Sequence, residues 1–232
     1  SFWEVLDWVF PPQCAGCGKP GTRWCEDCLA ELREVGEIVC PCCGKPQLHS
    51  AICRDCTAQP PCFQALRSLG IYEGSLRKVI QGLKYKRDMA LGQTLAEQML
   101  PAIRNLGWPV QMVIPIPLSK SRHAERGYNQ AGLIARPIAM AFDLNYSPKA
   151  LERWRETRSQ VGLSGAQRRE NVSGVFKADE RLVHGRNILL IDDVATTGST
   201  LSSAAEALMA SGAARVFAFT AARAGLAGTA AA

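Results

Sequence analysis

Ile188-Leu189-Leu190-Ile191-Asp192-Asp193-Val194-Ala195-Thr196-Thr197-Gly198-Ser199-Thr200 is the stretch that decides how this 232-residue chain is interpreted. Its first four residues are apolar and predict a buried strand. Two adjacent carboxylates follow at the carboxyl end of that strand, where ligands bind in open α/β sheets. The next turn is rich in hydroxyl groups and opens a helix, whose N-terminal N–H groups suit a phosphate. Gly198 lets the backbone approach phosphate oxygens closely.

The polar groups of this segment fit one particular ligand. Adjacent ionised carboxylates accept hydrogen bonds from the two hydroxyls of a vicinal diol, and the turn suits a phosphate monoester. A helix cap needs one hydroxyl, whereas this turn supplies four, and paired acids at a buried strand end are costly without a ligand. The segment lacks the glycine patterns of dinucleotide folds and P-loop NTPases. A diol and a phosphate on either side of one turn describe ribose 5-phosphate.

The chain after residue 62 predicts an α/β fold with a mainly parallel sheet flanked by helices. Apolar runs predict strands, and an apolar period of 3.6 residues predicts helices. The predicted strands cover 68–72, 112–116, 187–191 and 215–220, and the predicted helices cover 75–83, 91–106, 131–142 and 200–210. We expect Pro101 to interrupt the second helix and Pro137 to kink the third. Residues 147–182 are polar and rich in arginine, and predict an extended loop or lid.

Ten cysteines, all between Cys14 and Cys62, set the N-terminal part of the chain apart. Two Cys-x-x-Cys pairs make a tetrahedral four-sulfur site for zinc. The four pairs therefore predict two structural Zn²⁺ ions, held by Cys14, Cys17, Cys25, Cys28, Cys40, Cys43, Cys53 and Cys56. Sequential pairing is the simplest arrangement, and the spacing leaves a cross-braced one open. We interpret Cys42 and Cys62 as free thiols and His49 as a loop residue or substitute ligand. This pattern predicts a zinc-binding module over 1–62 and a second domain over 63–232.

The two parts differ in charge. Residues 1–62 hold five Lys/Arg and eight Asp/Glu, a net charge of −3. The rest of the chain holds 22 Lys/Arg and 13 Asp/Glu, a net charge of +9. Each four-cysteine zinc centre adds a formal −2, so the module is a poor partner for a phosphate backbone. We expect the zinc ions to replace a core that so short a segment can barely build. The basic second part favours single-strand binding, with Tyr85 and Tyr128 either stacking on bases or packing internally.

Further motifs accompany the central segment, which closely resembles the thirteen-residue fingerprint of type I phosphoribosyltransferases. They are the four cysteine pairs, Gly-Leu-Lys-Tyr at 82–85, Ile-Pro-Leu-Ser-Lys-Ser-Arg at 116–122 and Arg-Gly-Tyr-Asn-Gln at 126–130. Together they resemble the ComF family of competence-associated proteins with a double zinc ribbon. The resemblance implies a cytoplasmic bacterial protein with a type I phosphoribosyltransferase-like fold, linked to uptake of transforming single-stranded DNA.

The resemblance also implies roles for individual residues toward 5-phosphoribosyl-1-pyrophosphate (PRPP). Asp192 and Asp193 would hold the ribose hydroxyls, 196–200 would hold the 5′-phosphate, and Mg²⁺ would bridge the pyrophosphate and the ribose. The candidates for the pyrophosphate, in a short loop after strand 112–116 and just beyond it, are Ser119, Lys120, Arg122 and Arg126. Lid candidates are Gln160, Leu163, Ser164, Arg168 and Asn171.

One departure from related enzymes bears on catalysis. Hypoxanthine-guanine phosphoribosyltransferases place an acid where this chain has Thr196. The difference disfavours purine salvage and leaves no evident general base, so the catalytic residues and the acceptor are unknown.

Two functions from different classes remain open. One is an enzyme that transfers phosphoribose to an unknown acceptor. The other is an uptake factor that binds single-stranded DNA and uses the site for binding or sensing only. A zinc-ribbon regulator of transcription is a distant third. The family implies a DNA-uptake helicase and recombination proteins as partners.

The location of the chain is also predicted from its apolar content. A membrane-spanning helix needs about 20 apolar residues, and no run of that length occurs. The start, Ser1 to Phe10, is short and apolar, carries Glu4 and Asp7 and lacks a basic leader. We therefore expect a cytoplasmic protein without membrane insertion.

Overall fold

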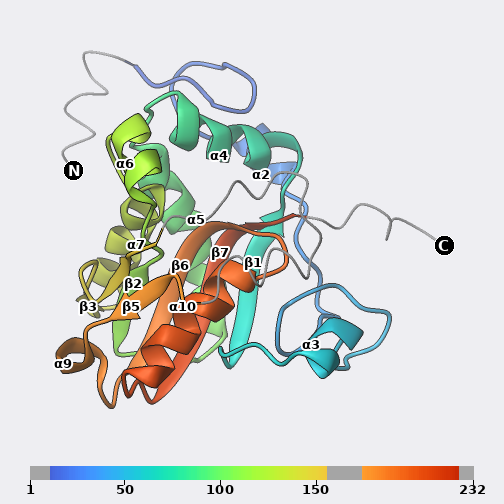
Figure 1. Ribbon diagram of the computed structural model, residues 1–232. Coiled ribbons are helices and arrows are strands. Elements are labelled where there is room, and N and C mark those ends of the chain that lie inside the picture. The colour runs from blue at the N-terminus through green and yellow to red at the C-terminus, as the bar shows by residue number, and fades with distance from the viewer. Residues whose placement is uncertain (1–10, 156–173, 225–232) are drawn as a thin grey trace.

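The computed structural model describes residues 11–155 and 174–224. Within those ranges the main sheet has five strands in the order β1-β7-β6-β2-β3, and every neighbouring pair is parallel. The strands are β1 (Ala65–Ile71), β2 (Met112–Pro115), β3 (Asn145–Tyr146), β6 (Asn187–Ala195) and β7 (Arg215–Arg223). The sheet is flanked by helices on both faces (Figure 1). The prediction of an α/β fold with a mainly parallel sheet is confirmed.

Strands β6 and β7 form the centre of the sheet because their apolar runs can be buried on both faces. Ile188, Leu189, Leu190 and Ile191 are fully buried. Strand β6 is longer than predicted, because pairing with β7 continues from Asp192↔Thr220 through the two aspartates to Ala195. The carboxylates therefore belong to the last paired residues of a central strand.

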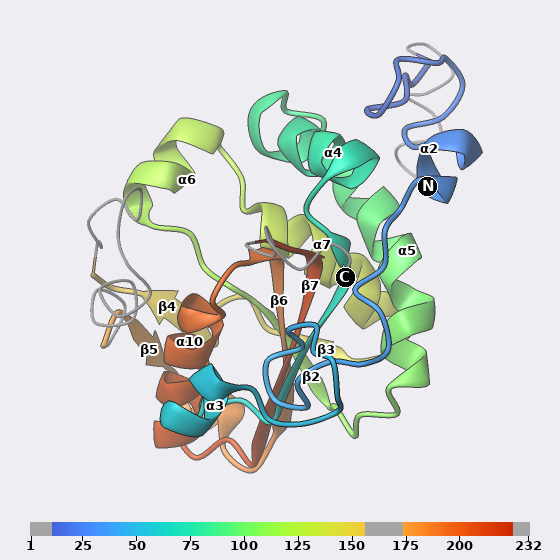
Figure 2. The same cartoon turned by 90° about the vertical axis from the view of Figure 1, so that its right-hand side faces the viewer.

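Helices α4 (Gly74–Tyr85), α5 (Leu91–Asn105) and α7 (Gln130–Ala141) lie on one face of the sheet and α10 (Ser199–Ala210) lies on the other (Figures 1 and 2). Helices α4, α5 and α7 share a hydrophobic cluster with the β6 and β7 side chains that face them. Helix α10 packs its buried leucines and alanines on the opposite face. The α10 helix begins directly after β6, so the turn between them lies at the carboxyl edge of the sheet.

The predicted interruption at Pro101 is wrong, whereas the predicted kink at Pro137 stays a prediction. Helix α5 runs continuously through Pro101, and α7 runs continuously through Pro137. A proline removes one backbone hydrogen bond inside a helix. In α5, Leu91, Leu95 and Met99 are fully buried against the sheet and neighbouring helices, and this packing outweighs the local penalty.

The segment predicted as a pyrophosphate loop and the predicted lid also differ from expectation. Residues Lys120–Arg126 form a short helix, α6, because Ser119 caps its start and Gly127, at φ 80°, ends it. The described ends of 147–182 carry the antiparallel strands β4 (Leu151–Arg153) and β5 (Phe176–Ala178), followed by α9 (Glu180–Val183). The named lid residues lie outside the described residues.

The cysteine-rich segment lies along the main domain at two separate places. Helix α2 (Glu26–Ala30) lies beside α4 (Figures 1 and 2). Helix α3 (Arg54–Ala58) carries Cys56 of the second cysteine group, which lies at the start of β1, where Leu66 N donates to the carbonyl of Cys42 at 2.7 Å. Cys14, Cys25 and Cys28 share a hydrophobic cluster with α4, α5 and the sheet. Two knuckle turns are closed by the isolated bridges Gln13↔Pro20 and Val39↔Pro46. Among the described helices, none has the length and apolar content needed to cross a membrane.

Candidate ligand site and metal centres

The turn between β6 and α10 has the backbone geometry of an anion site. Thr196 and Thr197 are exposed, Gly198 adopts a left-handed φ of 79°, and α10 begins at Ser199. The Thr197 hydroxyl donates to Ser199 Oγ at 2.9 Å and accepts from Ser199 N at 3.3 Å. The first N–H groups of a helix lack partners within the helix. The turn therefore presents hydroxyls and N–H donors together at the carboxyl edge of the sheet.

The two aspartates differ in their surroundings. Asp193 is buried, its Oδ1 lies 3.0 Å from Lys84 Nζ, and its Oδ2 is buried without a hydrogen-bond partner among the described residues. Asp192 is partly exposed, and its Oδ1 accepts from Asp193 N at 2.9 Å. Burial, and then the charge of Asp193, raise the pKa of Asp192 to about 7, against opposing effects of the Asp193 N–H, Lys84 and Arg122. The site can therefore change its charge near neutral pH.

Lys84 is a site residue that the sequence analysis missed. It lies in the last turn of α4, and only 16% of its side chain is exposed. The apolar period of α4 predicted the buried face of the helix but not the strand that its far end would meet. The available signal was its place in Gly-Leu-Lys-Tyr, which is one of the motifs that carry the family resemblance.

Apart from the cysteine pairs, the motifs quoted above meet at this edge of the sheet. The Tyr128 hydroxyl donates to the carbonyl of Leu83, and the Arg126 guanidinium lies 5.3 Å from the centre of the Tyr85 ring. Both contacts join residues 126–130 to the end of α4. Asn129 Nδ2 donates to the carbonyl of Ile116 at 3.0 Å, which joins the same segment to the end of β2. With the Lys84–Asp193 ion pair, the motifs form one continuous site.

The predicted pyrophosphate residues have different environments. Ser119 is buried, caps α6 by accepting from Arg122 N, and lies 3.1 Å from Ser121 Oγ. Lys120 and Arg122 are exposed on α6, and the charge of Arg122 acts on Asp192. Arg126 is partly buried, and its Nε and Nη1 lack hydrogen-bond partners in the described part of the chain. Arg122 and Arg126 are thus the cations that the fold links to the carboxylates and to α4.

The two tyrosines of interest are not equivalent. Tyr128 is half-buried with its hydroxyl bound to Leu83, and burial raises the pKa of Tyr128. Tyr85 is 65% exposed beside the ion pair of Lys84. Tyr128 therefore has the packing role, and Tyr85 presents an exposed ring with the Arg126 guanidinium beside it.

The eight paired cysteines form two separate groups with the geometry of metal centres. The groups are Cys14/Cys17/Cys25/Cys28 and Cys40/Cys43/Cys53/Cys56, and in each the sulfur atoms lie within 4.8 Å of one another. The Sγ atoms of Cys17 and Cys25, and those of Cys43 and Cys53, are 3.7 Å apart. A disulfide would require about 2.05 Å, whereas tetrahedral zinc with bonds of about 2.3 Å requires about 3.8 Å. The donor sets fit Zn²⁺, and the pairing is sequential.

Backbone donors prepare one thiol of each group for metal binding. Burial raises the pKa of Cys14, but N–H groups of Cys25, Cys17 and Gly16 outweigh it and hold the pKa at about 6. Cys40 has the same arrangement and the same lowered pKa of about 6. Because zinc binds the thiolate form, these contacts favour the metal-bound state. His49 lies outside both groups and is exposed.

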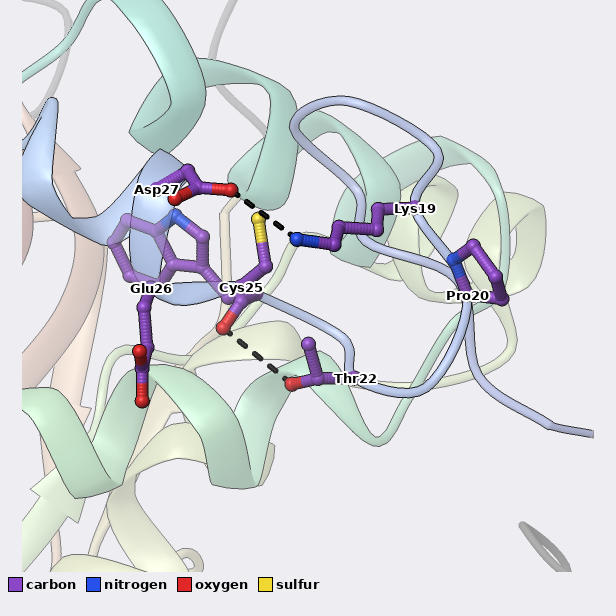
Figure 3. A pocket seen from close by; sticks show the side chains of 7 residues that line it. Lys19, Pro20, Thr22, Cys25, Glu26 and Asp27 are labelled. Carbon is purple, nitrogen blue, oxygen red and sulfur yellow. Dashed lines mark hydrogen bonds and ion pairs between the residues drawn. The ribbon is translucent and has the colours of Figure 1, made fainter.

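A hollow of about 320 Å³ lies on the first cysteine group, away from the turn. It is lined by Lys19, Pro20, Thr22, Trp24, Cys25, Glu26 and Asp27 (Figure 3). An ion pair at 3.4 Å joins two of the lining residues, Lys19 and Asp27 (Figure 3). None of the residues of the β6–α10 turn lines it, so it is separate from the candidate ligand site.

Comparison with known proteins assigns both parts of the chain. Residues 5–57 match the double zinc ribbon domain, and residues 134–229 match the phosphoribosyl transferase domain. DNA utilization protein YhgH of Escherichia coli O157:H7 is 34% identical over 216 residues, covering 89% of this chain and 94% of that protein. Competence protein ComFC of Bacillus subtilis is 30% identical over 211 residues, covering 87% and 85%.

A third relative agrees with these two. Competence protein F of Haemophilus influenzae is 29% identical over 204 residues, covering 84% of this chain and 83% of that protein. Both domains occur in the order that the motifs indicate. The chain therefore belongs to the ComF family, as a double zinc ribbon followed by a phosphoribosyltransferase domain.

Proposed function

We propose that the chain binds PRPP with Mg²⁺ at the β6–α10 turn and transfers its phosphoribosyl group to an acceptor. One observation carries this proposal. Asp193 is buried and paired with Lys84, yet its second carboxylate oxygen has no partner among the described residues, directly beside the exposed hydroxyls of the turn. A buried acceptor of this kind is costly unless a ligand donates to it.

The ligand is assigned to the site by its chemistry. The N–H groups and hydroxyls of 196–200 would hold the 5′-phosphate, as helix N-termini do. The carboxylates of Asp192 and Asp193 would accept hydrogen bonds from the ribose hydroxyls. The backbone of Val194 and Ala195, which still pairs with β7, fixes the distance between these two subsites.

The leaving pyrophosphate would be neutralised by the cations that border the carboxylates. The Arg126 guanidinium has donors without a partner within the described part of the chain, and Arg122 acts electrostatically on Asp192, which supports their role. Ser119 and Lys120 would complete this subsite at the start of α6. Mg²⁺ fits the hard oxygen donors of Asp192 and Asp193 and would offset the charge of the pyrophosphate.

The proposed reaction depends on electrostatic positioning. The bond from C1 of the ribose to pyrophosphate breaks, pyrophosphate leaves with the bonding electron pair, and the acceptor forms the new bond to C1. Positive charge that develops on the ribose ring is stabilised by Asp192 and Asp193. The names of the relatives support a role for this chemistry in competence and DNA utilization.

Single-strand binding without catalysis is the second candidate function. Tyr85 is 65% exposed with Arg126 over its ring, and Trp154 is 51% exposed with the Arg155 guanidinium 4.3 Å from its ring centre. Exposed aromatic rings with arginines suit unstacked bases. A DNA-uptake helicase and recombination proteins are partners that fit this function.

We also propose how the chain is divided into domains and where it is located. The zinc-binding part would cover 1–62 and the phosphoribosyltransferase-like part 63–232, with the zinc ions structural and the protein cytoplasmic. The hydrophobic cluster that includes Cys14, Cys25 and Cys28 together with α4 supports folding of the two parts as one unit.

Thermal unfolding of the zinc-loaded chain tests the proposed function. With Mg²⁺ present, PRPP should raise the unfolding temperature more than ribose 5-phosphate or pyrophosphate, because it fills both subsites. Release of pyrophosphate on addition of candidate acceptors would then identify the reaction. Equal unfolding temperatures with and without millimolar PRPP would contradict the proposal.

A further inference from the structure

The second metal centre is more deeply enclosed than the first. Cys40, Cys43, Cys53 and Cys56 are all buried, whereas the first centre has one exposed ligand, Cys17. Four thiolates and one Zn²⁺ carry a formal charge of −2. Removing that charge from water is costly unless cations or hydrogen-bond donors compensate it. The second centre therefore needs counter-charge from its own surroundings.

Arg223 supplies one positive charge from the main sheet. It is the last residue of β7 and is only 3% exposed. Its Nη1 donates to the carbonyl of Cys43 at 2.6 Å, and its charge acts on the Cys43 thiol. Its Nε is buried without a hydrogen-bond partner in the described residues. A buried guanidinium with one free donor suits a neighbouring anionic centre.

Arg67 supplies a second positive charge from β1. Its Nη1 donates to the carbonyls of Pro41, at 3.0 Å, and Leu66, at 2.9 Å. Its charge acts on the thiols of Cys40, Cys43 and Cys42. The guanidinium is thereby fixed against the third Cys-x-x-Cys turn.

The first centre has different cations. Lys78 Nζ donates to the carbonyl of Gly16 at 2.7 Å in the first Cys-x-x-Cys turn. Exposed lysine–aspartate pairs occur beside both centres, Lys19–Asp27 at 3.4 Å and Lys45–Asp55 at 3.5 Å, and do not distinguish them. Lysine is a strongly hydrated point charge, whereas arginine is suited to buried ion pairs. The fully buried second group of cysteines thus has arginines beside it, and the less buried first group has a lysine.

We infer that Arg67 and Arg223 are the counter-charge of the second zinc centre and set its metal affinity. Their two positive charges match the formal −2 of the bound centre. Since both arginines belong to strands of the main sheet, they also fix the second ribbon to that sheet. They are positioning residues, because they act through the cysteines and touch no substrate.

Zinc release from the full-length, zinc-loaded protein tests this inference. A zinc chelator is titrated, and native mass spectrometry counts the ions that remain bound. Alkylation of the freed cysteines, mapped by peptide, identifies the centre that has opened. In Arg223→Met and Arg67→Met, we expect the second centre to lose zinc at about 10- to 100-fold lower chelator concentration than in the parent. The first centre should release its zinc as in the parent.

The controls separate charge from packing. Arg223→Lys keeps the charge and should recover part of the lost affinity, whereas Lys78→Met should leave the second centre unchanged. Arg67 is partly exposed, so we expect Arg67→Met to fold. It therefore tests the inference even if Arg223→Met does not fold. The inference is overturned if folded Arg67→Met releases its second zinc at the parental chelator concentration, or if both centres weaken equally.

Discussion

Lys84 Nζ lies 3.0 Å from Asp193 Oδ1 and joins the end of α4 to the end of β6, 109 positions apart in the chain. The contact is nearly sealed from solvent, because the side chains are 16% and 6% exposed. The second oxygen of Asp193 has no hydrogen-bond partner among residues 11–155 and 174–224. The ion pair thus places a buried carboxylate at the point where a ligand would bind.

Removing the lysine should therefore destabilise the fold. In Lys84→Met, the carboxylate of Asp193 stays buried without its counter-charge, and we expect unfolding free energy to fall by about 3 kcal/mol. Lys84→Met/Asp193→Asn should recover much of that loss. Urea denaturation measures both, with the exposed Lys86→Met as control. A Lys84→Met midpoint equal to that of the parent would show that the pair does not support the fold.

The raised pKa of Asp192 predicts how ligand binding depends on pH. The pKa is about 7 in the folded chain, against an ordinary value of 3.8. A ligand that needs the ionised carboxylate should bind more tightly as pH rises from 6 to 8, with uptake of the ligand releasing a proton. Asp192→Asn should bind PRPP more weakly and lose this part of the pH dependence. Calorimetry in two buffers of different ionisation enthalpy measures the proton release.

The raised pKa of Asp192 also predicts how the stability of the fold without ligand depends on pH. Ligand binding should strengthen as pH rises, whereas this contribution to stability should weaken. Because the folded pKa is raised, the contribution of Asp192 to stability is full below pH 3.8 and is lost as pH rises through about 7. The difference in unfolding free energy between parent and Asp192→Asn should therefore change between pH 4 and 7. A constant difference across that range would contradict the pKa assignment.

Gly198 should be required for the turn but not for the metal centres. Its φ of 79° disfavours any side chain, and an added Cβ would also lie 3.4 Å from Leu66 Cδ2. We expect Gly198→Val to lower PRPP affinity at least about tenfold, or about 1.4 kcal/mol, with both zinc ions retained. Gly107→Ala has a comparable φ of 58° in open space and serves as control. Parental affinity in Gly198→Val would place the phosphate elsewhere.

Local sequence predicted the central segment well because its parts are adjacent in the chain. An apolar strand, two acids and a hydroxyl-rich turn determine β6, the turn and the start of α10 with little help from the rest of the protein. The cysteine spacing likewise predicted the number of metal centres. It did not predict that the two centres lie at separate places on the main domain, because that depends on packing against α4 and the sheet.

The missed features depend on contacts between distant segments. Lys84 becomes a site residue only when α4 ends beside β6, and the amphipathic period of α4 carries no information about that partner. Helix α6 is an exception, because its limits have local signals in the sequence, Ser119 before it and Gly127 after it. Continuous helices through Pro101 and Pro137 reflect tertiary packing that outweighs a local preference.

Substitution of Tyr85 tests the second candidate function, single-strand binding. Its ring is 65% exposed, so Tyr85→Ala should change unfolding free energy by less than about 0.5 kcal/mol. If strands stack on it, affinity for a short single-stranded oligonucleotide should fall by about 1–3 kcal/mol. Fluorescence anisotropy at several salt concentrations measures this. Unchanged strand affinity in Tyr85→Ala would remove the ring from any DNA surface.

The most direct test of the central claim is calorimetric titration of the zinc-loaded chain with PRPP and Mg²⁺. Asp193→Asn is compared with Glu206→Gln, which removes an exposed acid from α10. We predict one PRPP bound per chain in the parent and in Glu206→Gln, and affinity at least about 100-fold weaker in Asp193→Asn, or about 2.7 kcal/mol. Absence of binding to the folded, zinc-loaded parent, or equal affinity in Asp193→Asn, would contradict the claim that this site binds PRPP.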